Sequence, residues 1–295
     1  MKRLTLKFII AAIFMFVSCS SLFAENEQLK VFVSILPQKY FAERLLENNG
    51  IVEVLIGPGM SPHTFEPLPQ QMGKLSRSDL FFTVGIPFEK VIVSRIKNLC
   101  PNLLIVHTDE NIVKIPMNEH HDHEGHEHHD EDESGLDPHF WLDPVRTLVM
   151  AENMAKAIIS KRPELKEKIN GNLEVIKSDI NKLDSELTQK LLPFKGQTLL
   201  VFHPAFGYFA NKYGMIQKAV EIEGKEPAPR QLGELIRNCR NEGIKVIFVQ
   251  KQFPVSTAKT IAASIGGSVV AIDPLSEDYL NNLRTIAESV ADSKN

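Results

Sequence analysis

The chain has 295 residues, of which 43% are hydrophobic and 24% charged, and its net charge is −4. This is the composition of a globular protein with room for one large core or two domains of about 130 residues each. It excludes a disordered tail protein, a collagen-like repeat and a strongly basic nucleic-acid-binding protein, so we expect no nucleic-acid partner. The acidity is local, because residues 118–133 hold eight acids, no bases and six of the ten histidines.

The first 24 residues have the pattern of a secretory signal peptide. Three basic residues precede an apolar run at 8–17, and small residues follow up to Ala24. The run is too short to cross a bilayer of about 30 Å as a helix. We therefore predict cleavage after Ala24 and export to the periplasm. The alternative is a lipid-anchored mature form that begins at Cys19, because a loose lipoprotein cleavage box precedes this cysteine.

Export makes the cysteine count informative, because disulfides persist outside the cytoplasm. If Cys19 leaves with the signal peptide, Cys100 and Cys239 remain, and they fall in different halves of the chain. We expect two isolated, buried thiols rather than a disulfide. The chain also has no Cys-x-x-Cys pair that could bind a metal.

Two stretches of the mature chain alternate short β-rich runs with helical patterns. Continuous apolar runs of this kind are typical of parallel strands covered on both faces, so each stretch is predicted to form a small open α/β domain. The predicted strands are 30–35, 52–56, 80–84 and 103–106, then 198–202, 218–222, 246–249 and 268–272. The predicted organisation is a signal peptide at 1–24, an N-terminal lobe at 29–142, a connector at 143–192 and a C-terminal lobe at 195–293.

The connector is predicted to be helical. Helix signals run from Asp143-Pro144 to about Lys161, and Pro163 begins a second helix with apolar residues every three or four positions up to Leu191. About 28 residues at 1.5 Å each make a helix of roughly 42 Å. A coiled-coil dimerisation helix is the alternative. We predict a rigid strut packed along both domains of a monomer, because the helix has a single apolar seam and joins the two halves.

A histidine-rich segment at 117–136 interrupts the first domain and has no periodic apolar pattern. We interpret it as a disordered loop, inserted in the first domain, that attracts metal ions. One hypothesis is that it collects zinc weakly or senses zinc sufficiency, and the alternative is a solvated insertion without such a role. Its histidines are His120, His121, His123, His126, His128 and His129.

Four residues outside this loop are candidate metal ligands. His203 and Asp273 directly follow predicted strands, and His63 follows one through a short turn, where ligands of open parallel sheets bind. His139 stands between the acidic loop and the connector. Three imidazoles and one carboxylate suit a divalent ion, above all Zn²⁺ in tetrahedral coordination. His107 also ends a strand-like run, and the residues alone leave it open as a further candidate.

Five short motifs, in order along the whole mature chain, carry a family resemblance. They are Ser-Pro-His-Thr-Phe-Glu-Pro at 61–67, Asp-Pro-His-Phe-Trp-Leu-Asp-Pro at 137–144, Val-Phe-His-Pro-Ala-Phe-Gly-Tyr-Phe at 201–209, Pro-Ala-Pro-Arg-Gln-Leu at 227–232 and Ile-Asp-Pro-Leu at 272–275. With these motifs the chain resembles the metal-binding receptors of bacterial ABC importers, in the zinc and manganese cluster that includes the periplasmic zinc receptor.

The resemblance implies two α/β lobes joined by one long rigid helix, with a metal ion in the cleft between them. It places the family's metal ligands at His63, His139, His203 and Asp273. Histidine at 203 and a histidine-rich loop before the second ligand are similar to the zinc receptors, whereas manganese receptors often have Glu at the third position. This chain lacks the cysteine pair that some zinc receptors carry in the second lobe, so no disulfide carries over.

The function expected from these features is that of an extracytoplasmic solute-binding protein, which captures Zn²⁺ as transported ligand and delivers it to the membrane permease of an ABC importer. A manganese or iron receptor of the same family is the alternative. A zinc-dependent hydrolase is not favoured, because catalytic zinc keeps an open position and the chain has neither His-Glu-x-x-His nor Gly-x-Ser-x-Gly, so we expect no enzyme. Zinc binds neutral imidazole, so affinity should fall as the pH drops through about 6.5.

Overall fold

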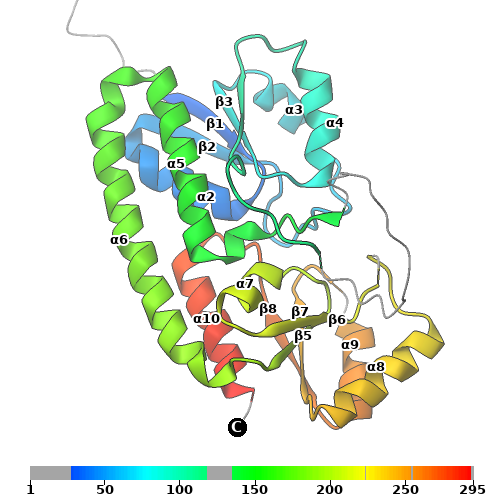
Figure 1. The fold of residues 1–295 in the computed structure, drawn as a ribbon. Helices are drawn as coiled ribbons and strands as arrows, with labels where there is room; N and C mark the ends of the chain where they lie inside the picture. Colours follow the sequence, from blue (N-terminus) through cyan, green and yellow to red (C-terminus); the bar gives the residue numbers. More distant parts are fainter. Residues whose placement is uncertain (1–27, 118–134, 223, 254, 294–295) are drawn as a thin grey trace, which may run out of the picture.

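The computed structural model describes residues 28–117, 135–222, 224–253 and 255–293. Two parallel four-stranded sheets, one in each half of the chain, are joined through a pair of long helices (Figure 1). The strands are β1 (Leu29–Val33), β2 (Gly50–Val54), β3 (Leu80–Thr83), β4 (Leu104–His107), β5 (Thr198–Val201), β6 (Ile216–Ala219), β7 (Val246–Gln250) and β8 (Ser268–Ile272). The α-helices are α2 (Leu36–Leu46), α3 (Pro69–Leu75), α4 (Pro87–Ile96), α5 (Pro144–Lys161), α6 (Lys166–Leu191), α7 (Gly207–Lys212), α8 (Pro229–Asn241), α9 (Val255–Ile265) and α10 (Tyr279–Asp292).

The two sheets have the same strand order. It is β2-β1-β3-β4 in the first sheet and β6-β5-β7-β8 in the second, and all paired strands are parallel. In each sheet the chain adds the second strand on one side of the first and then crosses to the other side. This reversal creates the switch point at which open α/β folds bind ligands. The predicted fold class is confirmed, and we call the two sheets with their helices the N-terminal and C-terminal lobes.

All eight predicted strands form, and the differences lie mainly at the sheet edges. Strands β2 and β6 begin at Gly50 and Ile216, two residues before their predicted starts. Both are edge strands, and the side chains of Ile51 and Ile216 are 50% and 51% exposed. The buried apolar run that marks a central strand is therefore missing where these strands begin.

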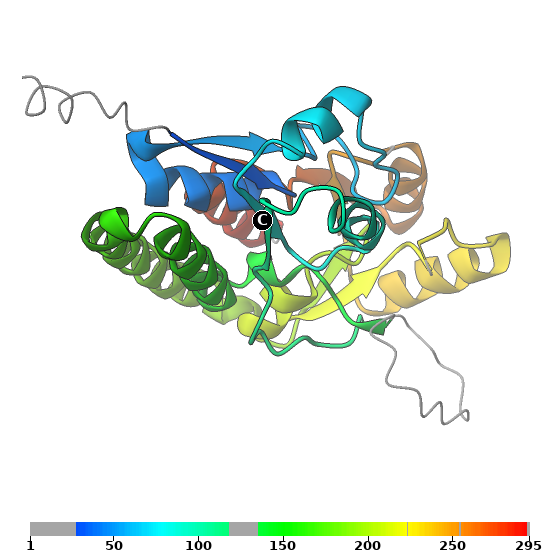
Figure 2. The same cartoon turned by 90° about the horizontal axis from the view of Figure 1, so that it is seen from above.

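The connector contains the two predicted helices. Helix α5 occupies the predicted span, and the Asp143 side chain caps its first turn by accepting a hydrogen bond of 2.9 Å from the Val145 N–H. Helix α6 has 26 residues, which makes it about 39 Å long. It packs against α5 and α2 of the N-terminal lobe and against α10 of the C-terminal lobe. Figure 2 shows α5 and α6 side by side along one flank of the molecule.

The apolar seam of α6 is covered by helices of the same chain. Seven seam residues, from Ile169 to Leu191, are buried. This arrangement confirms the strut and leaves the seam no free apolar face for a coiled coil. Cys100 and Cys239 are both free thiols, as expected, but only Cys239 is buried, whereas Cys100 is partly exposed.

The predicted signal peptide and most of the histidine-rich segment lie outside the described residues. Among the helices of the described ranges, none combines the length and apolar character needed to span a membrane.

Shortening a seam side chain should destabilise the protein far more than shortening its exposed neighbour. Ile176 is fully buried, so Ile176→Ala should lower the free energy of unfolding by about 2–5 kcal/mol. Val175 is 55% exposed on the same turn, and Val175→Ala should change it by no more than about 0.5 kcal/mol. Urea denaturation measures both, and equal losses would contradict the strut.

Candidate metal centre

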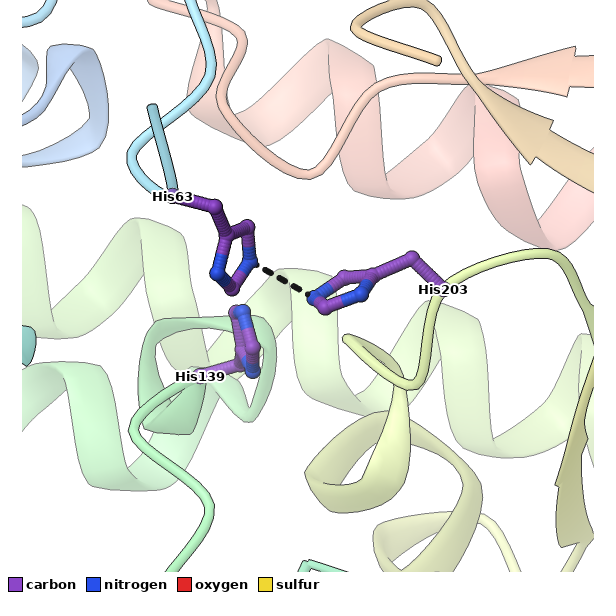
Figure 3. Close-up of side chains that lie close together, drawn as sticks. All are labelled: His63, His139 and His203. Carbon is purple, nitrogen blue, oxygen red and sulfur yellow. Dashed lines mark hydrogen bonds between the residues drawn. The ribbon is translucent and has the colours of Figure 1, made fainter. Parts of the chain in front are cut away.

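Three of the predicted ligands converge at one point. The imidazoles of His63, His139 and His203 point toward one another in Figure 3, and each offers a nitrogen within 4.8 Å of the other two. The Nε2 atoms of His63 and His203 are 3.0 Å apart. Ligand nitrogens around a tetrahedral zinc, with Zn–N bonds of about 2.0–2.1 Å, lie about 3.3 Å apart. The spacing therefore suits a single metal ion held by all three rings.

The three ligands come from both lobes. His63 lies in the loop between β2 and α3, and His139 stands just before α5, whereas His203 follows β5. The cavity that they line measures about 20 Å³. This is enough for a single water molecule or ion and too small for an organic solute. His63 is the exposed member of the group, and the other two are each only 5% exposed.

A buried carboxylate fixes the orientation of each buried histidine. The His139 Nδ1 lies 2.7 Å from Asp137 Oδ1, and the His203 Nδ1 lies 2.7 Å from Glu221 Oε2. Both acidic side chains are nearly inaccessible, at 1% and 6% exposure. With the Nδ1 proton donated to a carboxylate, the Nε2 lone pair of each ring is left for the metal.

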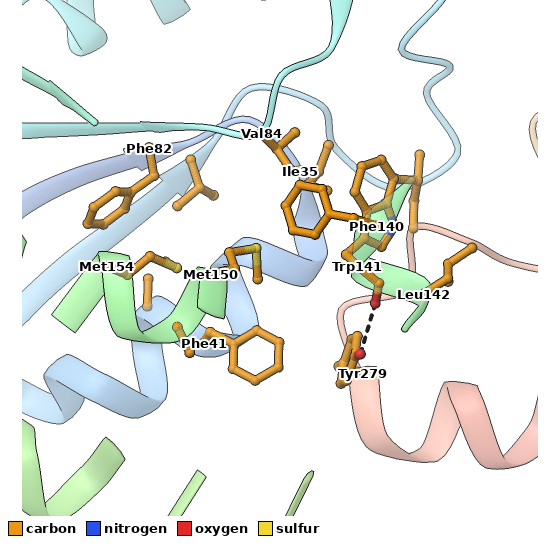
Figure 4. Packing of buried hydrophobic residues seen from close by; sticks show 14 of the residues in the cluster. Ile35, Phe41, Phe82, Val84, Phe140, Trp141, Leu142, Met150, Met154 and Tyr279 are labelled. Atoms are coloured by element: carbon orange, nitrogen blue, oxygen red, sulfur yellow. Dashed lines mark hydrogen bonds between the residues drawn. The ribbon is translucent and has the colours of Figure 1, made fainter. Parts of the chain in front are cut away.

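The backbone of His139 is held by the residues that follow it. Phe140 and Trp141 are completely buried. Figure 4 shows the hydrogen bond of 2.8 Å in which the Tyr279 hydroxyl of α10 donates to the Trp141 carbonyl. The Trp141 indole N–H donates in turn to the Pro274 carbonyl, at 2.8 Å, in the C-terminal lobe. This ligand therefore sits on a segment that is tied to both lobes.

The backbone and ring of His203 are also fixed. Its N–H donates to Gln250 Oε1 at 3.2 Å, and its carbonyl accepts from Gln250 Nε2 at 2.6 Å. The Phe253 ring stacks on the imidazole, with ring centres 5.1 Å apart and planes 17° apart. A side chain locked by packing and hydrogen bonds presents its donor atom with little entropy left to lose.

The surroundings keep two of the histidines neutral. Burial lowers the pKa of His63 to about 4, with further lowering from the neighbouring His203 and His139. Burial also lowers the pKa of His203, although its hydrogen bond to Glu221 acts in the opposite direction. The neutral imidazole is the form that binds metal. Loss of affinity is therefore expected at a lower pH than the value of about 6.5 expected for unperturbed histidines.

The predicted fourth ligand, Asp273, lies beside this group but not within it. Its Oδ1 accepts hydrogen bonds from the Leu275 N–H at 2.9 Å and from Gln252 Nε2 at 3.1 Å, and Lys251 Nζ lies 3.8 Å from Oδ2. In the described part of the chain, the convergent ligand atoms belong to the three histidines alone.

The further candidate His107 lies elsewhere. It is the last residue of β4, its Nδ1 is 2.8 Å from the Thr83 hydroxyl, and it lines a separate cavity beside α4.

Sequence reasoning missed the two orienting carboxylates. Asp137 precedes His139 by two residues in the Asp-Pro-His motif, and this short separation is the only sign in the sequence that its carboxylate could contact the ring. Glu221 was placed inside a predicted strand at 218–222. Strand β6 in fact ends at Ala219, so Glu221 lies at the carboxyl edge of the sheet, where the other site residues were sought.

Neutralising one orienting carboxylate should weaken zinc binding without unfolding the protein. Glu221→Gln removes the charge that holds the His203 ring, and we expect a loss of zinc affinity of about 10–100-fold. Glu234→Gln, on the exposed α8 of the same lobe, is the matched control and should leave affinity unchanged. Competition with a zinc chelator measures both variants, and equal affinities would contradict the role of Glu221.

The lowered pKa values of His63 and His203 predict a shallow pH dependence of zinc binding. Each proton that zinc must displace lowers the affinity tenfold per pH unit. Because the pKa values of both groups are lowered, both take up protons at a lower pH than unperturbed histidines, so fewer than three protons compete just below a pH of about 6.5. A plot of log Kd against pH between about 6 and 5 should have a slope well below three. A slope near three would show that all three imidazoles titrate normally.

Comparison with known proteins places these features in a family. A family model described as ZnuA, the periplasmic component A of the zinc-uptake complex, matches residues 31–293. The zinc-binding protein AdcA of Streptococcus pyogenes is 27% identical over 266 residues, covering 84% of this chain and 50% of AdcA. The chain thus spans about half the length of the curated relatives that it matches.

Solved structures agree with the family model. A crystal structure of ZnuA superimposes with a TM-score of 0.82 and 29% identity, covering 91% of this chain and all of that one. A zinc-bound deletion mutant of ZnuA gives the same TM-score with 30% identity, covering 90% of this chain and 98% of that one. The chain belongs to the ZnuA family of periplasmic zinc-uptake components.

Proposed function

We propose that this protein is an extracytoplasmic solute-binding protein that captures Zn²⁺ and delivers it to the membrane permease of an ABC importer. The observation that carries the proposal is the convergence of three imidazoles from both lobes on a cavity for one small ion. Family membership and the zinc-binding relatives support the same function.

Zinc is favoured over manganese or iron, the alternative within the family. The three convergent donors are nitrogens, and imidazole suits zinc better than it suits Mn²⁺, which prefers carboxylate, carbonyl and water oxygens. AdcA is named as a zinc-binding protein, and a related ZnuA structure has zinc bound.

We propose His63, His139 and His203 as metal ligands and Asp273 as the fourth. The support for Asp273 is its position, because the two residues after it, Pro274 and Leu275, line the cavity. Its Oδ2 also has only Lys251, at 3.8 Å, as a charged neighbour in the described residues.

The site favours binding and release over catalysis. A cavity of about 20 Å³ between fixed donors leaves no room for an organic substrate beside the ion. A zinc hydrolase needs such room and an activated water. We therefore propose a receptor without enzymatic activity.

The partner is proposed to be the permease, and the location outside the cytoplasmic membrane. The signal-peptide pattern at 1–24 supports export, with the lipid anchor at Cys19 as alternative. The buried seam of α6 supports a monomer. We retain the lobes at 29–142 and 195–293 and the connector at 143–192 as the proposed domains.

Removing one histidine ligand tests the function directly. His203→Ala should lower zinc affinity at least about 100-fold, because losing a ligand costs more than losing its hydrogen-bond partner. Metal content after purification and competition binding with Zn²⁺ and Mn²⁺ measure the effect. His107→Ala, in the separate cavity, is the control and should keep tight zinc binding. Tighter binding of Mn²⁺ than Zn²⁺ by the parent protein would overturn the proposal.

A further inference from the structure

The side chain of Gln252 is bonded on one side only. It lines the metal cavity together with the three histidines. Its Nε2 donates a hydrogen bond of 3.1 Å to Asp273 Oδ1. Its Oε1 is buried, and no hydrogen-bond donor in the described part of the chain reaches it. A buried carbonyl oxygen without a partner is unfavourable and calls for an explanation.

Two other buried side-chain atoms of the described residues also lack a partner, but they complement each other. Asp137 Oδ2 is an acceptor and Gln217 Nε2 is a donor. Both lie next to Gly207, at 2.5 and 3.5 Å from the position that a Cβ would occupy there. A single water between them can bond to both. Gln252 Oε1 differs, because it is the one member of the three on a residue that lines the metal cavity.

The bonding of Gln252 repeats the pattern of the two buried ligands. In His139 and His203, the ring Nδ1 lies against a carboxylate, that of Asp137 and that of Glu221 respectively. The Nε2 atom on the other side of each ring remains free to accept. In Gln252 the amide N–H faces the Asp273 carboxylate, and the oxygen is left over. In metal sites, a hydrogen bond from one ring nitrogen to a carboxylate orients the other nitrogen toward the metal. The hydrogen bond from Gln252 to Asp273 can orient the amide oxygen in the same way.

We propose that Gln252 Oε1 is an oxygen donor of the metal site and contacts the bound cation directly, with Asp273 orienting the amide. The inference rests on the zinc-receptor function proposed above. Gln252 and the three histidines line one cavity of about 20 Å³, which has space for about one small ion or one water. The hydrogen bond from Gln252 occupies Asp273 Oδ1 and leaves Oδ2 for the metal, so both residues can bind an ion that accepts four or five ligands.

The first test replaces the amide by an apolar side chain of similar size. Gln252→Leu should weaken zinc binding at least tenfold, and it should shift the visible absorption bands of the Co²⁺-loaded protein because an oxygen donor is lost. The melting temperature measured without metal should not fall, since the variant removes an unpaired buried oxygen. Gln70→Leu, at an exposed position of α3, is the matched control. Unchanged affinity together with unchanged Co²⁺ bands would overturn the inference. If Gln252→Leu fails to fold, Gln252→Ala is measured in the same way.

A second comparison separates a direct donor from a residue that merely holds Asp273. In the Asp273→Ala background, Gln252→Leu should cause a further loss of zinc affinity if the oxygen touches the ion. No further loss would mean that Gln252 acts only through Asp273, and the direct contact would be wrong.

The failure of this inference is distinguishable from failure of the function. Tight zinc binding by the parent protein, abolished by His203→Ala but unaffected by Gln252→Leu, overturns the role of Gln252 alone. A parent protein that binds no zinc overturns both.

Discussion

The pairing of each buried histidine with a buried carboxylate is the interaction on which the site depends. A carboxylate taken out of water is unfavourable unless it is hydrogen-bonded, and Asp137 Oδ1 accepts from both the backbone N–H and the ring of His139. Three neutral imidazoles alone would provide donor atoms for a divalent cation but no negative charge. Asp137 and Glu221 place two carboxylates immediately behind the rings. The same bonds therefore orient the ligands and provide the electrostatic attraction.

The segment that carries His139 also connects the two lobes. The Tyr208 hydroxyl of α7 donates to the Asp137 carbonyl at 2.8 Å and accepts from the Ile115 N–H at 3.1 Å. An ion pair of 2.6 Å joins Lys39 of α2 to Glu277 of the C-terminal lobe. With α6 packed along both lobes, these contacts resist a wide opening of the cleft. His63, on the loop between β2 and α3, is the most exposed of the three histidines.

The sequence predicted the fold well because the fold depends on repeated patterns. Each apolar run and each helical seam involves many residues. An error of two residues in the predicted bounds of an edge strand therefore does not change the predicted fold. The site was predicted only in part. Three candidate ligands could be predicted because they follow strands or adjoin proline: His63, His139 and His203. Glu221 could not, because the predicted strand ended at 222, whereas β6 ends at Ala219. The role proposed for Gln252 has no signal in the sequence, because it depends on an unpaired oxygen that only the structure shows.

The proposed preference for zinc rests on the donor atoms of the site and on the size of the cavity that they line. Cations that prefer octahedral oxygen coordination keep several of their waters, and each water needs space of its own. A cavity of about 20 Å³ has space for about one water molecule. An ion that accepts three nitrogens and completes its shell with one or two oxygens from the protein loses all its waters there. Zn²⁺ tolerates this low coordination number because it has no electronic preference for a particular geometry. In the proposed site, the fixed donors on both lobes would therefore act against competing ions through the available space as well as through affinity.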